Sequence, residues 1–227
     1  NAGTGTAGIA AARSSVGAVA LVADVDAHSV LPFSTGVIGE PLPVQRLEQA
    51  VPAAFAALRA DGWAAAAQGI LTTDTRPKAL SVCFSCDGRD YVVTGIAKGS
   101  GMIRPNMATM LAFIATDMAV EQTLLQEMLA ELVDISFNRI TVDGDTSTND
   151  ACLLLATGEA GNIPVGDRAS ALYQALRKAV EDVCTKLAQS IVRDGEGASK
   201  FVTVQINGGG SEAECLEVAF TIAHSPL

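Results

Sequence analysis

The spacing of apolar residues predicts that helices and strands alternate along the chain. Residues 9–22 are alanine-rich and compatible with a helix. Apolar side chains recur every three or four residues, as on the buried face of a helix, in residues 44–60 and 120–133 and in a long segment that ends near Val192. Pro52 lies within residues 44–60 and predicts a kink or a later helix start. Asp167 or Ser170 can cap the long helix. A capping box at Ser211 and Glu214 predicts a last helix.

Shorter apolar runs predict strands. The segment "VCFSCDGRDYVV" predicts a hairpin that turns at Asp87-Gly88, and "YVVTGIAKGSGM" carries its second strand into a glycine-rich loop. Further strands are expected in "GILTTDT", "MLAFIATD", "KFVTVQI", and on both sides of the polar loop in "RITVDGDTSTNDACLLLAT". Because hairpins and helical crossovers both occur, the pattern predicts an α/β fold with mixed sheets and layered helices.

Composition and charge exclude several classes of protein. The 227 residues are 49% hydrophobic and 18% charged, which suits one substantial core or two modest lobes. A net charge of −10 and the lack of any basic run argue against a nucleic-acid partner. No apolar run reaches the roughly 18 uninterrupted residues of a membrane span, so no membrane partner is expected. The five cysteines follow no paired pattern, which favours a reducing compartment and a cytoplasmic protein.

Three short motifs suggest binding sites, and each lacks part of its pattern. The G-x-G-x-x-G motif that begins at Gly3 has no visible strand before it and no well-placed acidic residue after it. The C-x-x-C motif at Cys83 has no second pair and lies in the expected hairpin. Asp143-x-Asp145 resembles the start of a calcium loop without its glycine and closing glutamate. We therefore expect no metal and no bound cofactor, and interpret these segments as a tight turn, a strand pair and a hydrogen-bonded polar loop.

Lys98 and Thr109 are the candidates for chemistry. Lys98 precedes the glycines of "KGSGM", whereas a P-loop needs its lysine after them, so its ammonium is better suited to a substrate carboxylate. The alternative is a solvated surface lysine. The chain has only two histidines, His28 and His224, which are few for a catalytic triad or a histidine metal site. An acyl-transfer nucleophile would therefore need another base.

An N-terminal residue can use its own α-amine as that base, since its pKa is about 8. Thr109 would become N-terminal if the chain cut itself after Ala108. The small Ala108 side chain leaves its carbonyl open to attack, and the preceding glycines permit a strained backbone. The alternative is that Thr109 is an ordinary strand residue, because β-branched side chains favour strands.

Several blocks of the sequence together closely resemble the ornithine acetyltransferase family. They are "STGVIGE", "TTDTRPK", "AKGSGMIRPNMATMLAFIATD", "TVDGDTSTND" and "DGEGASKF", and the similarity runs in order from Asn1 to Leu227. The resemblance implies a four-layer αββα fold of the self-processing, N-terminal-nucleophile-like kind. It also implies α and β chains that assemble as an α2β2 heterotetramer in the cytoplasm. Family chains extend beyond "NAGTG" and "IAHSPL", so no C-terminal site residue is carried over.

The resemblance also implies a reaction. A precursor cuts itself between Ala108 and Thr109, which divides this sequence into an α-chain part, residues 1–108, and a β-chain part, residues 109–227. Thr109 then carries acetyl from N-acetylornithine to glutamate in a ping-pong cycle of arginine biosynthesis. The implied oxyanion hole is Thr35 and Gly36.

The substrate contacts that the resemblance implies are Thr72, Lys98, Thr109 and Glu196. No cofactor is implied, and use of acetyl-CoA as a second donor is left open. Two alternatives remain. One is a self-processing aminopeptidase or amidase of the same fold, which would pass the acyl group to water. The other is a non-enzymatic metabolite-binding domain, which would stay a single uncut chain.

Overall fold

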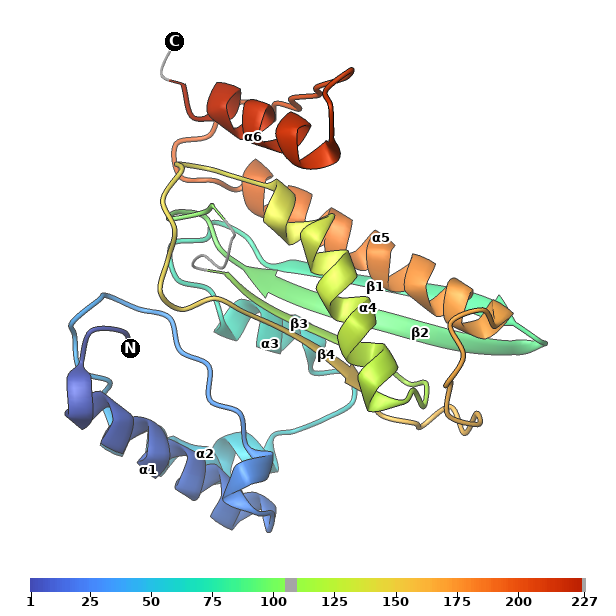
Figure 1. Cartoon of the computed structure of the whole chain (residues 1–227). Coiled ribbons are helices and arrows are strands. Elements are labelled where there is room, and N and C mark those ends of the chain that lie inside the picture. Colours follow the sequence, from blue (N-terminus) through green and yellow to red (C-terminus); the bar gives the residue numbers. More distant parts are fainter. Residues whose placement is uncertain (105–109, 226–227) are drawn as a thin grey trace.

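The strands in the described part of the chain form one mixed sheet (Figure 1). The computed structural model describes residues 1–104 and 110–225. Within them lie the four strands of the sheet, β1 (Lys78–Cys86), β2 (Arg89–Lys98), β3 (Leu111–Thr116) and β4 (Ala151–Ala156), in the order β1-β2-β3-β4. The pairs β1/β2 and β2/β3 are antiparallel, and β3/β4 is parallel. The predicted α/β fold with a mixed sheet is therefore confirmed.

The β1–β2 hairpin turns where the sequence predicts. Asp87 and Gly88 both have positive φ angles, 51° and 75°. Two such residues between paired strands make the turn whose twist matches that of the strands, and Asp-Gly is a preferred sequence for it. The register then runs without a break from Cys86↔Arg89 to Lys78↔Ala97. This places Lys98 one residue beyond that pairing, at the end of β2 far from the turn.

Two helices cover one face of the sheet, α4 (Gln122–Asp134) and α5 (Ala171–Arg193) (Figure 1). The hydroxyl of Ser170 accepts the N–H of Tyr173 at 3.2 Å, so the predicted cap of α5 is confirmed. At Gly95 of β2 an added Cβ would lie 2.7 Å from Val183 and 2.9 Å from Leu187. Only glycine lets α5 approach the sheet this closely.

A short helix, α3 (Trp63–Gly69), contacts β1 and β2 from the other side of the sheet, and its Ala67 is fully buried (Figure 1). On the same side the Phe33 ring packs edge-on against Phe113, with ring centroids 5.3 Å apart. The described residues thus supply one sheet and one complete helical layer, which are two of the four layers of the expected αββα arrangement. The sequence pattern did not reveal α3.

A helical pair, α1 (Gly5–Ala23) and α2 (Val44–Ala56), lies beside the sheet, with the short 3-10 helix η1 (Ala27–Ser29) after α1 (Figure 1). Pro52 lies within α2, which ends earlier than the pattern predicts. By length and composition α1 is apolar enough to cross a membrane, a property that buried core helices and signal sequences share. The expected lack of a membrane partner therefore stays a prediction.

Three predicted strands are wrong. In "GILTTDT" the glycine ends α3, and the N–H groups of the next two residues donate to carbonyls of that helix. The N–H groups of Thr72 and Thr75 donate to carboxylates rather than to a strand. In "RITV" a 3-10 helix, η2 (Phe137–Arg139), leads into a loop. Residues 200–206, "KFVTVQI", alternate like a strand, but no described segment pairs with them, and Val202 is 71% exposed. A strand requires a neighbour for its N–H and C=O groups.

The last helix, α6 (Glu212–Ala223), begins as predicted. The Ser211 hydroxyl accepts the N–H of Glu214 at 3.2 Å. The Glu214 carboxylate accepts the N–H of Gly210 instead of the N–H of Ser211, so the capping box is completed one residue earlier than in the usual motif.

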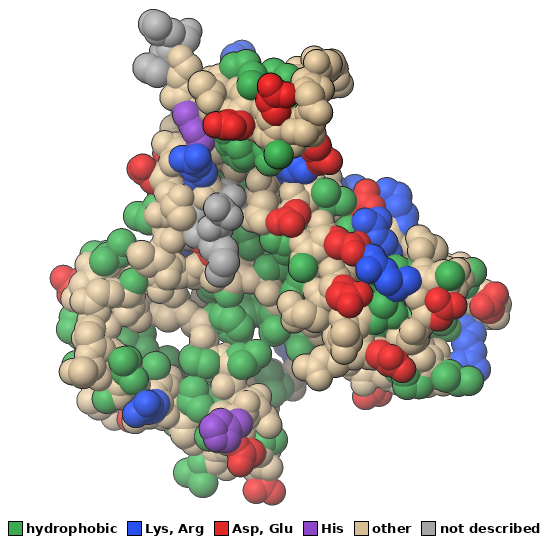
Figure 2. Space-filling view, in the orientation of Figure 1, with side chains coloured by type: hydrophobic (Ala, Val, Ile, Leu, Met, Phe, Trp, Pro, Cys, Tyr) green, Lys and Arg blue, Asp and Glu red, His purple; other side chains and the backbone are tan. Residues whose placement is uncertain are grey.

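The outer surface over α4 and α5 carries interspersed acidic and basic side chains (Figure 2). Arg168 pairs with Glu127 and Glu131, and Lys178 pairs with Asp182. Exposed pairs of this kind contribute little to stability. This face offers no concentrated positive charge of the kind that binds nucleic acid.

Candidate active site

The carboxylate of Asp74 joins the "TTDT" loop to the end of β2. Its Oδ1 accepts the N–H of Gly99 at 2.7 Å, and its Oδ2 accepts the N–H of Thr72 at 3.3 Å. Burial alone would raise the pKa of Asp74, but the hydrogen bonds from Gly99 and Lys78 outweigh it and lower the pKa. Asp74 is therefore a fixed anion that brings Thr72 next to the Lys98-Gly99 segment.

Lys78 links this loop to the C-terminal end of α5. Its Nζ lies 2.6 Å from Asp74 Oδ1 and 2.6 Å from Asp194 Oδ2, and all three side chains are almost completely buried. The Thr75 N–H donates to Asp194 Oδ2 at 3.1 Å, and the Thr75 hydroxyl also bonds to this carboxylate. Together these bonds position the segment that follows α5, where Glu196 lies.

Glu196 lies against the glycine loop that follows Lys98. Its N–H donates to the Ser100 carbonyl at 2.7 Å, and the Ser100 hydroxyl lies 2.7 Å from that of Thr73. A Cβ added at Gly101 would come within 2.6 Å of the Glu196 carboxyl group. The glycine at this position thus makes room for the Glu196 side chain.

Lys98 is a buried cation at the centre of these segments. Its side chain is 1% exposed. Burial lowers its pKa, and the nearby positive charge of Lys78 adds to this effect. The carboxylates of Asp74, Asp150 and Glu196 oppose it. The interpretation of Lys98 as a solvated surface lysine is therefore wrong.

Asp150 lies where the two parallel strands β3 and β4 begin. Its Oδ1 accepts the N–H of Met110 at 2.7 Å, and the N–H of Ala151 donates to the Met110 carbonyl at 3.1 Å. The other oxygen, Oδ2, is buried and has no hydrogen-bond partner among the described residues. Burial raises the pKa of Asp150 to about 7, although the Met110 N–H and the Lys98 charge act in the opposite direction.

The two expected oxyanion-hole residues follow Ser34 in the loop that precedes α2. The Asn149 side chain donates to the Ser34 carbonyl at 2.9 Å, and the Ser34 hydroxyl bonds to the Asn1 side chain at 2.7 Å. Thr35 and Gly36 are thereby tied to the polar loop that ends at Asp150. Their roles stay predictions.

The cleavage site and the nucleophile, Ala108 and Thr109, lie outside the described residues. The nearest described residue after them is Met110, which the bonds from Asp150 and Ala151 hold in place. The division into parts 1–108 and 109–227 therefore stays a prediction as well.

The polar loop is tied into the fold by backbone hydrogen bonds, as the sequence suggests. Asp143 accepts the N–H groups of Met102 and Ile103. At the start of the same loop, Nε2 of His224 lies 2.9 Å from the Thr141 hydroxyl. His28 lies on η1 and is exposed.

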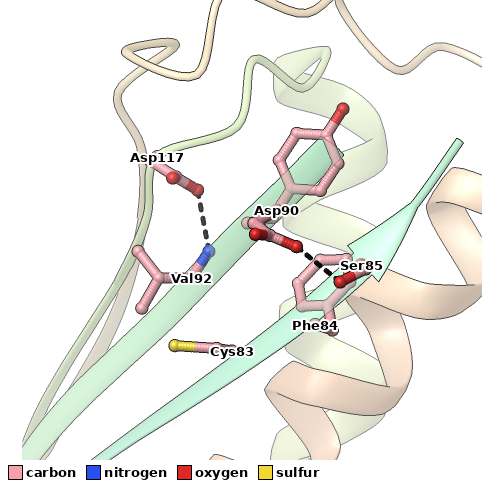
Figure 3. Close-up of a pocket in the computed structure, with 7 residues that line it drawn as sticks. Cys83, Phe84, Ser85, Asp90, Val92 and Asp117 are labelled. Atoms are coloured by element: carbon pink, nitrogen blue, oxygen red, sulfur yellow. Dashed lines mark hydrogen bonds between the residues drawn. The ribbon is translucent and has the colours of Figure 1, made fainter. Parts of the chain in front are cut away.

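A separate hollow of about 350 Å³ lies at the opposite end of β2 from Lys98, beside the hairpin turn (Figure 3). Both of its carboxylates are already hydrogen-bonded, Asp90 to Ser85 and Asp117 to the N–H of Val92 at 3.1 Å. We therefore assign the candidate active site to the Lys98 end of the sheet.

Comparison with known proteins identifies the family of this chain. The model of the ArgJ family matches residues 1–227, which is the whole chain. The chain belongs to the ArgJ family. The resemblance drawn from the sequence blocks is thus confirmed.

Curated ArgJ relatives are similar over all of this chain. The "Arginine biosynthesis bifunctional protein ArgJ" of Pseudomonas syringae pv. tomato is 58% identical over 227 residues, which are 100% of this chain and 56% of that protein. The protein of the same name from Pseudomonas fluorescens is 56% identical over the same length and share. The chain thus spans about half the length of the curated ArgJ proteins it matches.

A solved ArgJ structure is also similar. The crystal structure of "Arginine biosynthesis bifunctional protein argJ" from Bacillus halodurans overlays with a TM-score of 0.47 and 39% sequence identity. The overlay covers 50% of this chain and 53% of that one.

The motifs did not assign roles to several residues of this ArgJ site. Asp74 is part of "TTDT" and Asp150 ends "TVDGDTSTND", but neither was predicted to do anything, and Asp194 was not singled out. A usable signal for Asp150 was a polar run that ends directly before an apolar strand. Nothing in the sequence indicated that Lys78 would lie between two carboxylates from distant segments.

Proposed function

We propose that this chain is part of a glutamate N-acetyltransferase that transfers acetyl from N-acetylornithine to glutamate. The observation that carries the proposal is the Lys98 side chain, which is 1% exposed and lies at the end of β2, where the charges of Asp74, Asp150 and Glu196 act on it. A buried cation of this kind is strongly stabilised by an anionic partner. Both substrates carry an α-carboxylate, which can be that partner.

The residues around Lys98 are suited to bind both the α-carboxylate and the side-chain amine of an amino acid. Glu196 lies beside the glycine loop on the far side of Ser100, and it is exposed. Its carboxylate is suited to the side-chain amine of an ornithine derivative. Thr72, held by Asp74, offers a hydroxyl for a further hydrogen bond to the substrate. The name of the curated relatives, which places them in arginine biosynthesis, supports this substrate class.

The proposed chemistry begins with self-cleavage between Ala108 and Thr109, which frees the α-amine of Thr109. That amine takes the proton of the Thr109 hydroxyl as the hydroxyl oxygen attacks the acetyl carbonyl of N-acetylornithine. Thr35 and Gly36 are the proposed donors to the oxygen that becomes negative in the tetrahedral intermediate. Ornithine leaves with the proton, and Thr109 keeps the acetyl group as an ester.

Glutamate then occupies the same site and completes the cycle. Its α-carboxylate binds Lys98, and its amine attacks the acetyl ester, so N-acetylglutamate leaves and Thr109 regains its hydroxyl proton. One site serves both half-reactions, which is the basis of a ping-pong scheme. Whether acetyl-CoA also acylates Thr109 is left to experiment, and no bound cofactor or metal is part of the proposal.

The proposed assembly is an α2β2 heterotetramer of the two cleaved chains in the cytoplasm. The rival enzyme is a self-processing aminopeptidase or amidase, which would pass the acyl group to water. Lys98 favours the acetyltransferase. A second amino-acid substrate needs a cation to bind its carboxylate, whereas a water molecule does not.

The test uses a protein of the full length of the curated relatives, of which this chain spans about half. N-terminal sequencing should find a chain that begins at Thr109, and Thr109→Ala should remain uncut. With N-acetylornithine and glutamate, the product should be N-acetylglutamate. Free acetate at the same rate with or without glutamate would favour the amidase. A chain that stays whole and yields neither product would favour the non-enzymatic alternative.

A further inference from the structure

A continuous chain of bonds joins the glycine loop after Lys98 to the segment that follows α5. The Gly99 N–H donates to Asp74 Oδ1 at 2.7 Å. The same carboxylate oxygen lies 2.6 Å from Lys78 Nζ, which in turn lies 2.6 Å from Asp194 Oδ2. Lys78 is therefore the bridge between the two segments.

The backbone closes this chain of bonds into a ring. Asp194 is followed by Gly195 and Glu196, and the Glu196 N–H donates to the Ser100 carbonyl at 2.7 Å. Ser100 directly follows Gly99, where the chain of bonds begins. We call this closed structure the Lys78 ring. Its members are Asp74, Lys78, Gly99, Ser100, Asp194 and Glu196.

The ionic side of the Lys78 ring is strongly fixed. The side chains of Asp74, Lys78 and Asp194 are 0%, 1% and 3% exposed, so water hardly competes for their charges. Both carboxylates have lowered pKa values and stay ionised near neutral pH. Thr75 adds two more bonds to Asp194, one from its N–H at 3.1 Å and one from its hydroxyl. The segment after α5 thus has a fixed position relative to the glycine loop.

The two proposed substrate-binding groups are attached to this ring. Lys98 directly precedes Gly99, and Glu196 is itself a member of the ring. In the proposed function, Lys98 binds the α-carboxylate of N-acetylornithine and Glu196 binds its side-chain amine. The spacing between the two groups then has to match the number of methylene groups in the substrate.

We propose that the Lys78 ring selects the length of the amino acid that donates acetyl, with Lys78 and Asp194 as positioning residues. The inference rests on the proposed function. Neither residue needs to touch the substrate, because both act by holding Glu196 at a set distance from Lys98. The three methylene groups of ornithine reach both groups, whereas the four of lysine displace the acetyl group. A displacement of about 1 Å at a reacting centre can cost about 100-fold in rate.

The test compares two acetyl donors with glutamate as the acceptor, in a protein of the full length of the curated relatives. The donors are N-acetylornithine and Nα-acetyllysine, and the measured quantity is the ratio of their kcat/KM values. The wild type should favour N-acetylornithine by about 10- to 200-fold, as is usual for one methylene group.

Asp194→Ala opens the ring and still leaves Asp74 as the partner of Lys78. The donor ratio should fall at least about fivefold, because Glu196 can then move to meet the longer donor. If this variant melts below the assay temperature, Asp194→Asn replaces it. Asparagine has nearly the same shape but no charge, so the ratio should still fall, by a smaller factor.

Ser170→Ala is the matched control for lost stability. It removes the cap at the opposite end of α5, where the Ser170 hydroxyl accepts the Tyr173 N–H at 3.2 Å. This variant should melt at a lower temperature than the wild type and keep the wild-type donor ratio. A general loss of stability would change the ratio in both variants alike.

Three outcomes would overturn the inference. They are a wild type that does not distinguish the two donors, a variant of Asp194 that keeps the wild-type ratio, and an equal fall of the ratio in Ser170→Ala. Each can occur while the wild type makes N-acetylglutamate from N-acetylornithine, in which case the proposed function survives. A wild type that makes no N-acetylglutamate would instead overturn the proposed function itself.

Discussion

The carboxyl group of Glu196 lies 2.6 Å from the place that a Cβ atom would take on Gly101. Gly101 belongs to the loop after Lys98, and Glu196 follows α5, so this contact sets the distance between the two proposed substrate-binding groups. The N–H of Glu196 also donates to the carbonyl of Ser100 at 2.7 Å, so the backbone of Glu196 cannot easily move away.

Gly101→Ala should therefore displace the Glu196 side chain while leaving the fold intact. We expect KM for N-acetylornithine to rise more than KM for glutamate, because Glu196 is proposed to bind the ornithine amine. Steady-state kinetics with each substrate varied will measure this. Gly17→Ala on α1 is the control, since nothing lies within 4 Å of a Cβ added there. Equal changes in both KM values would show that Glu196 does not bind the ornithine amine.

Lys98→Met should weaken the binding of both substrates, because each is proposed to place its α-carboxylate on the ammonium. Loss of one charge-assisted hydrogen bond costs about 1.5–3 kcal/mol, which corresponds to a rise in both KM values of about ten- to a hundredfold. Lys200→Met removes an exposed lysine and should leave both unchanged. Normal kinetics in Lys98→Met would show that the substrates do not use this group.

Lys78→Met should strongly destabilise the fold, because two buried carboxylates, Asp74 and Asp194, would lose their common cation. Removing one partner of a buried pair costs about 3–5 kcal/mol in the free energy of unfolding. Urea denaturation will measure this. Lys186→Met, which removes an exposed lysine of α5, is the control. If the variant keeps its stability, the buried pairs do not hold the loop and α5 together.

The pH dependence of stability follows from the same residues. The pKa values of Asp74 and Asp194 are lower in the folded chain than their ordinary values. Their contribution is therefore present above the unfolded pKa of about 4 and is lost as pH falls through the folded value. Wild-type stability should decline on acidification below about pH 4, and Lys78→Met should show much less of this decline.

Replacing both histidines should not stop acetyl transfer, because the α-amine of Thr109 is the proposed base. His28→Asn combined with His224→Gln removes both imidazoles, and intact-mass measurement after mixing with N-acetylornithine should still detect acetyl-Thr109. Loss of the bond from His224 to Thr141 can lower the melting temperature. A folded, self-cleaved double variant that forms no acetyl-enzyme would make a histidine the base.

Local chemistry explains why much of the fold could be predicted. Asp87-Gly88 can adopt two positive φ angles, so the hairpin and its register follow from the sequence near the turn. Ser170 and Ser211 cap α5 and α6 through N–H groups only three residues away. The strand predicted for residues 200–206 was wrong because its pattern describes one face of a sheet, whereas a strand also requires a partner.

The sequence by itself determined the family and the elements with local signals, and it made Lys98 a candidate site residue. Only the tertiary structure decided what surrounds Lys98. Asp194 reaches Lys78 across 116 residues of sequence. Asp150 meets Met110 because β3 and β4 run parallel and begin side by side. Burial and charge at a site depend on segments brought together by packing, and a pKa near neutrality arises only after that packing has removed the carboxyl group from water.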